Sequence, residues 1–159
     1  MGIFKIYILT ALCLWQQTEP SSYIQGNNFE GYIFNKEFFI LLTIKNQKVR
    51  YTPNSEDITN AEQIISQKLY RINRKRINQA SPCPIIHENL KNYERQYFGF
   101  INRRGEKIIW INYIIKDYVT KEMLAKDLIL PKDGCSNFWN VKVNLNLGKI
   151  FDLHINGPG

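Results

Sequence analysis

The sequence predicts an α+β fold in which one long amphipathic helix packs on a mainly antiparallel sheet. Two observations lead to this prediction. A stretch that begins at Thr52 repeats apolar residues at helical spacing, and the chain later contains two pairs of strand-like segments, each joined by a turn. A helix with one apolar stripe must bury that stripe against another element, and one face of the sheet is the partner available.

Length and composition support a single domain with an ordinary core. The chain has 159 residues, of which 44% are hydrophobic and 13% aromatic. Single cores commonly form at about 100–200 residues, and disordered chains lack such a supply of apolar groups. The formal net charge of +7 makes anionic surfaces candidate partners.

The first eighteen residues have the features of an export signal. Lys5 precedes an apolar run at residues 6–15, and polar residues follow. No A-x-A triplet marks a cleavage site, and Cys13 offers a lipoprotein-type alternative, although Leu12 is larger than the residue expected before a lipidated cysteine. We therefore predict a cleaved or lipidated leader at residues 1–18 and one domain at residues 19–159. The protein would be exported: periplasmic, secreted or lipid-anchored in the cell envelope. The alternative is an N-terminal element packed in the core.

The helix is predicted from about Thr52 to about Asn78. Thr52 can cap the helix, Pro53 suits its first position, and acidic residues follow in the first turn, where the helix dipole favours them. The apolar stripe consists of Ile58, Ala61, Ile65, Leu69 and Ile72. The turn-forming segment 81–84 ends this element.

The remaining segments read mostly as strands. Residues 29–34 and 38–44 are runs of aromatic and branched side chains, although the second run also suits a short core helix. A hairpin joins residues 93–101 to 107–114 across residues 102–105, where Gly105 can adopt the positive φ of such loops. A second hairpin joins 137–145 to 149–156, and residues 116–130 form a short helix or an irregular crossover.

The order of these elements resembles a cystatin-like or NTF2-like arrangement. Residues 93–102, 105–112, 134–138, 141–145 and 151–157 are also similar to an uncharacterised family of small exported Bacteroidetes-type bacterial proteins, a domain of unknown function. That resemblance implies export but no activity, so it assigns no catalytic or binding residue.

The cysteines allow one disulfide in the mature chain. If the leader is removed, Cys83 and Cys135 remain. An exported protein permits the bridge, which would close a long loop and contribute about 4 kcal/mol at most. The alternative is two small apolar side chains in the core.

Motifs for catalysis, metals and phosphate are weak or absent. Cys135, Asp152 and His154 are residue types that build a thiol nucleophile, but nothing in the sequence brings the cysteine to its base. His87 and His154 are the only histidines, no zinc spacing occurs, and the glycines form no phosphate loop. We therefore predict no catalytic, cofactor or metal site.

The candidate interaction surface is basic. It comprises Lys68, Arg71 and Lys75 at helical spacing and the hairpin tip Asn102, Arg103, Arg104 and Gly105, with the loop at residues 132–137 as a further candidate. The alternative is a solvated helix face. Aromatic residues such as Tyr97 and Trp110 fit a core better than a stacking platform.

The sequence thus favours a small exported binding module without a catalytic site. Its expected partner is another protein or an envelope component. Nucleic acid is not expected, and membrane association is expected only if Cys13 is lipidated; the oligomeric state stays open. The alternative is a small NTF2-like enzyme or ligand-binding protein with a pocket between helix and sheet, lined by Tyr93, Tyr97, Trp110 or His154.

Overall fold

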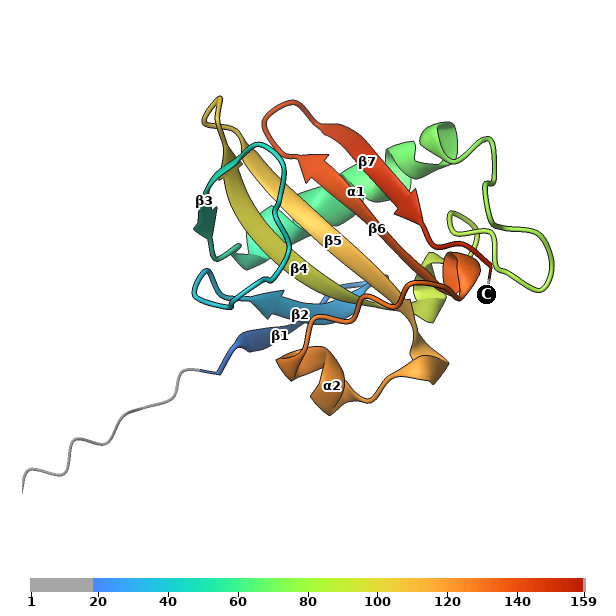
Figure 1. Ribbon diagram of the computed structural model, residues 1–159. Coiled ribbons are helices and arrows are strands. Elements are labelled where there is room, and N and C mark those ends of the chain that lie inside the picture. The colour runs from blue at the N-terminus through green and yellow to red at the C-terminus, as the bar shows by residue number, and fades with distance from the viewer. Residues whose placement is uncertain (1–18, 159) are drawn as a thin grey trace, which may run out of the picture.

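The computed structural model describes residues 19–158, and the predicted leader at residues 1–18 lies outside them. The α+β prediction is confirmed: the described chain forms one seven-stranded, mostly antiparallel sheet with one main helix (Figure 1). The elements are β1 (Ser21–Gln25), β2 (Glu30–Phe34), β3 (Gln47–Tyr51), α1 (Ser55–Ile72), β4 (Tyr93–Asn102), β5 (Lys107–Ile115), α2 (Lys121–Lys126), β6 (Phe138–Asn144) and β7 (Lys149–Ile155).

The strands follow the order β1-β2-β4-β5-β6-β7. All neighbours are antiparallel except β2 and β4, which are parallel. The outer edge of β4 is shared, since β2 pairs with its residues 95–97 and β3 pairs with its residues 99–102. Both predicted hairpins, β4–β5 and β6–β7, are present at nearly the predicted bounds.

α1 covers one face of the sheet, lying behind it in Figure 1. Its buried side chains include Ile58, Ile65 and Leu69, and they pack on the alternate residues of β4, β5 and β6 that point to the same side. Those sheet residues are Tyr93, Tyr97, Ile109, Ile111, Tyr113, Trp139, Val141 and Val143. Asn54 caps the helix by accepting from the backbone N–H of Asp57.

The opposite face is covered by irregular chain. The β2–β3 loop and the segment around α2 pack on a second apolar cluster, which includes Phe34, Phe98 and Trp110. Two side-chain amides, paired across β4 and β5, bind the segment around α2 to the sheet. Gln96 Nε2 donates to the carbonyl of Leu124, and Asn112 Nδ2 donates to the carbonyl of Ile129. Buried amides that are hydrogen-bonded in this way fix the path of the chain without leaving polar groups unpaired.

Two predicted elements need correction. The helix begins at Ser55 with Asn54 as its cap, instead of Thr52 with Pro53 in the first position. It ends at Ile72 instead of Asn78, since Arg76 and Asn78 have positive φ. Residues 38–44 are not a strand: Phe38, Ile40 and Ile44 pack inward, but β2 and β3 already occupy the edge of β4 and leave the segment no pairing partner.

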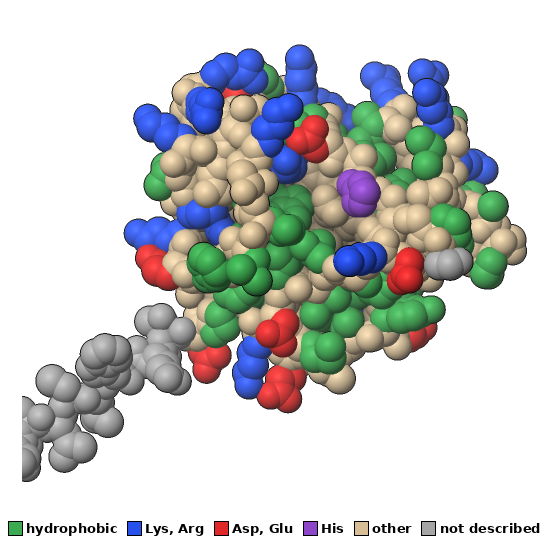
Figure 2. Space-filling view, in the orientation of Figure 1, with side chains coloured by type: hydrophobic (Ala, Val, Ile, Leu, Met, Phe, Trp, Pro, Cys, Tyr) green, Lys and Arg blue, Asp and Glu red, His purple; other side chains and the backbone are tan. Residues whose placement is uncertain are grey.

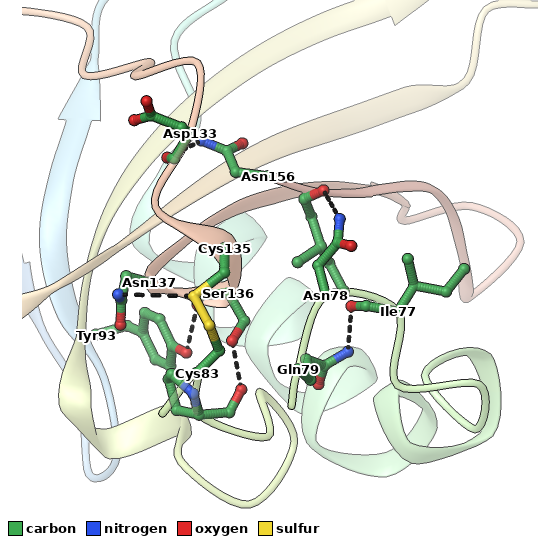
Figure 3. Close-up of a disulfide and its surroundings, with 12 residues drawn as sticks. Ile77, Asn78, Gln79, Cys83, Tyr93, Asp133, Cys135, Ser136, Asn137 and Asn156 are labelled. Carbon is green, nitrogen blue, oxygen red and sulfur yellow. Dashed lines mark hydrogen bonds between the residues drawn. A yellow bond between two sulfur atoms is a disulfide. The ribbon is translucent and has the colours of Figure 1, made fainter. Parts of the chain in front are cut away.

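A disulfide joins Cys83 to Cys135, with their Cα atoms 6.1 Å apart (Figure 3). The sequence had left this pair open between a bridge and two separate thiols. Hydrogen bonds reinforce the junction, because Ser136 Oγ donates to the carbonyl of Pro84 and the Tyr93 hydroxyl donates to the carbonyl of Ser136 at 2.7 Å. The long segment between α1 and β4 is therefore anchored to the start of β6.

No helix in residues 19–158 is both long enough and apolar enough to span a bilayer.

Reduction of the disulfide should destabilise the fold. The bridge closes a loop with a sequence separation of 52 residues, for which chain entropy predicts a loss of about 2–4 kcal/mol. Urea unfolding of the oxidised protein, the reduced protein and the Cys83→Ser/Cys135→Ser variant measures it. A loss well below about 1 kcal/mol in both reduced forms would contradict a stabilising role.

Candidate functional site

Of the predicted basic residues, Lys68 and the hairpin tip lie at one end of the sheet, whereas Lys75 lines a hollow with His154 and Ile155 near the other end of β7. Lys68 Nζ donates to the carbonyl of Gly148 in the β6–β7 turn, and the backbone N–H of Lys107 donates to Asn146 Oδ1 in the same turn. Lys68 and the hairpin tip therefore lie on either side of the β6–β7 turn. Figure 2 shows Lys and Arg side chains gathered along this rim, at the top of the view.

The loop at residues 132–137 does not belong to that surface. It leads into β6, whose first residue Phe138 pairs with Ile114 near the end of β5, while the hairpin tip precedes Lys107 at the start of β5. The two loops therefore lie at opposite ends of the sheet. The prediction that they form one surface was wrong because a hairpin tip and the loop entering the next antiparallel strand occupy opposite ends by topology.

A groove of about 1070 Å³ opens between the N-terminal half of α1, the β1–β2 turn and the loop that precedes β4. Its lining is mainly polar. Six side-chain amides and three hydroxyls contribute, from Gln25, Asn27, Asn28, Gln63, Asn89, Asn92, Ser55, Thr59 and Ser66. Four charged residues, Glu62, Glu88, Lys91 and Arg95, are also part of the lining, as is His87.

Glu62 is buried although it forms part of the wall of the groove, with 7% of its surface exposed. Its Oε1 accepts hydrogen bonds from the hydroxyls of Tyr97 at 3.0 Å and Tyr113 at 3.2 Å, and lies 3.2 Å from Arg95 Nε. The Arg95 contact is mainly electrostatic, because its Nε–H makes no well-aligned hydrogen bond. Oε2 receives no hydrogen bond from the described residues, so one carboxylate oxygen remains for a ligand in the groove.

Arg95 joins the two walls of the groove. It is 1% exposed. Its Nη2 donates to the carbonyl of Asn28 in the β1–β2 turn at 3.3 Å and to that of Leu90 in the opposite loop at 2.9 Å, while Nη1 donates to the carbonyl of Tyr93 at 2.6 Å. The planar guanidinium suits this role because it carries five donors in fixed directions.

Burial and charge around Glu62 keep Tyr97 and Tyr113 neutral and Arg95 positively charged. Burial and then the negative charge of Glu62 raise the pKa of Tyr97 and Tyr113 well above its usual value, so both phenols remain donors. Burial lowers the pKa of Arg95, but the charge of Glu62 together with smaller contributions from Tyr113 and Tyr97 outweighs burial, so the net pKa is raised. Arg95 therefore stays charged.

A second network positions the wall that precedes β4. Asn73, just beyond α1, donates to Gln79 Oε1 at 2.8 Å and lies 2.8 Å from His87 Nδ1. Gln79 Oε1 also accepts from the backbone N–H of Ile86 at 3.0 Å. His87 is thus held by an amide at the edge of the groove.

The groove is not lined by the residues predicted for a helix–sheet pocket. Tyr93 and Tyr97 are fully buried beneath it, Trp110 lies on the opposite face of the sheet, and His154 lines a separate hollow beside the end of α1. The sequence does contain a pattern that could have identified Glu62 and Arg95 as buried charged residues. Arg95 falls at the apolar alternation of Tyr93 and Tyr97, and Glu62 falls on the helix stripe four residues after Ile58.

The arrangement offers binding groups and no nucleophile–base pair. Cys135 is in the disulfide and so is not a free thiol, and Asp152 lies 3.0 Å from Lys142 Nζ in an ion pair. Within residues 19–158, no cluster of three or more His, Cys, Asp or Glu residues could hold a metal ion.

No family model, no curated protein and no solved structure matches the chain. The resemblance to small exported bacterial proteins therefore stays a prediction, and the case for function depends on the groove.

Glu62 and Arg95 should be strongly coupled in stability. Glu62→Leu alone leaves a buried guanidinium without its counter-charge, which costs about 3–5 kcal/mol. The double variant Glu62→Leu/Arg95→Met removes both charges. Its loss in free energy of unfolding should therefore be about 2 kcal/mol smaller than the summed losses of Glu62→Leu and Arg95→Met. Urea unfolding of the four proteins measures the coupling, and strictly additive losses would contradict it.

Proposed function

We propose that the protein is a small, exported, non-enzymatic binding module whose site is the groove beside Glu62. The supporting observation is the carboxylate itself. Three buried groups hold Oε1 of Glu62, while Oε2 has no partner among the described residues and Glu62 forms part of the groove wall. Because Oε2 is not sealed from solvent, a donor on a ligand in the groove can reach it and form a charge-assisted hydrogen bond.

The lining indicates a hydroxyl-rich ligand. Side-chain amides both donate and accept, as do hydroxyl groups, so a surface of amides and hydroxyls matches a ligand whose groups do the same. Large apolar side chains are few in the lining: Ile24, Phe29 and Leu90. Of the envelope components that an exported protein meets, an oligosaccharide fits this chemistry best.

The fixed geometry supports recognition over catalysis. Arg95 and the two tyrosines hold the orientation of Glu62, and Arg95 also fixes the walls on both sides. A preorganised site loses little conformational entropy when a ligand binds.

Binding to a panel of soluble envelope-type oligosaccharides tests this function. Titration calorimetry should find a ligand whose affinity falls at least tenfold in Glu62→Gln and several-fold in Gln63→Ala, which removes an exposed amide of the lining. Glu56→Gln is the matched control, because Glu56 is an exposed carboxylate on the same helix outside the groove. Absence of binding across the panel, or equal affinities for Glu62→Gln and Glu56→Gln, would refute the proposal.

A further inference from the structure

The β2–β3 loop exposes an unusual set of apolar side chains. Phe39 is 78% exposed, Leu41 88% and Leu42 52%, while their neighbours Phe38 and Ile40 pack on the sheet. The inward side chains fix the loop to the core and the outward ones project from it. Single exposed apolar residues are ordinary, but a group of this size on one segment marks an interaction surface.

Basic residues surround this group. Residues 36–50 contain the exposed cations Lys36, Lys45 and Lys48 against the single anion Glu37, whereas the Arg50 guanidinium packs inward over the Phe98 ring. Further positive charge comes from the β4–β5 hairpin tip, because the backbone N–H of Arg103 donates to the carbonyl of Asn46 at 3.2 Å and so holds the tip against the loop. Figure 2 shows hydrophobic side chains gathered on this face of the molecule, below the Lys and Arg side chains at the top of the view.

We propose that the β2–β3 loop and the hairpin tip together form a docking surface for an anionic lipid bilayer. The apolar side chains Phe39, Leu41 and Leu42 enter the boundary between headgroups and acyl chains, and Lys45, Lys48 and Arg103 contact the headgroup phosphates. Apolar insertion combined with adjacent cations is the pattern of interfacial binding. A protein partner would have to match both parts of the surface, whereas an anionic bilayer supplies both by its nature.

This surface is distinct from the groove. The groove is bounded by α1, the β1–β2 turn and the loop before β4, whereas the docking loop packs on the second cluster, across the sheet from α1. The two proposals can therefore fail separately. Membrane association here requires no lipid on Cys13.

Vesicle co-sedimentation of the full chain tests the proposal. All proteins carry Cys13→Ser, so that no lipid can be attached, and comparison between variants of the same chain cancels whatever residues 1–18 contribute. Vesicles of mixed phosphatidylglycerol and phosphatidylcholine should bind at least tenfold better than pure phosphatidylcholine. The preference should shrink as salt is raised, because salt screens headgroup attraction.

Two variants separate apolar insertion from simple charge. Phe39→Asp/Leu41→Asp should weaken binding to the anionic vesicles at least tenfold. Tyr70→Asp/Ile77→Asp changes the net charge equally at two exposed positions on the α1 side of the sheet and should weaken binding to the anionic vesicles less than twofold. Lys45→Gln/Lys48→Gln should remove most of the preference for anionic lipid. Circular dichroism and urea unfolding check that each variant is folded.

Three results would overturn the proposal: no binding by the parent chain, equal loss in the two aspartate variants, or binding that the Phe39→Asp/Leu41→Asp change leaves intact. Loss of dimerisation in that variant with unchanged vesicle binding would instead make the loop a self-association surface.

Discussion

The buried ion pair between Glu62 and Arg95 is the interaction around which the rest of the structure is arranged. It joins α1 to β4 across the helix–sheet interface, with the Arg95 side chain 1% exposed. Such a pair gains from its mutual attraction only if further hydrogen bonds satisfy both partners. Here two tyrosine hydroxyls serve the carboxylate and three backbone carbonyls serve the guanidinium. The carbonyls belong to β4 and to both walls of the groove, so one ion pair fixes the packing of the helix and the shape of the site.

The sheet then separates two kinds of surface. On the α1 side, the disulfide at Cys83 and the network of Asn73, Gln79 and His87 fix the long segment that becomes one groove wall. On the other side, irregular chain covers the sheet, and hydrogen bonds from Gln96 and Asn112 hold its α2 segment in place. The β2–β3 loop packs on the same side and exposes its outward apolar side chains. Rigid elements thus position both surfaces, as is usual for loops that bind.

Patterns over short stretches of sequence correctly predicted the hairpins and the main helix, because these elements are determined by nearby residues. The two hairpins depend on alternation and on a turn that Gly105 permits, and the helix depends on its apolar stripe. The strand predicted at residues 38–44 failed because alternation shows which side chains face inward but not whether a sheet edge is free. β1 and β3 were not predicted, since their exposed polar residues carry little apolar signal. The site was missed because Glu62 and Arg95 become meaningful only when the fold brings them together.

Hydrogen–deuterium exchange of an Arg95→Lys variant tests most directly whether this ion pair organises the groove. Lysine retains a positive charge for Glu62 but lacks the planar fork that reaches the carbonyls of both walls. The account predicts faster exchange in residues 26–29 and 87–92 together, with β6 and β7 unchanged. Unchanged exchange in both walls, or a change in only one of them, would show that Arg95 does not hold the groove together.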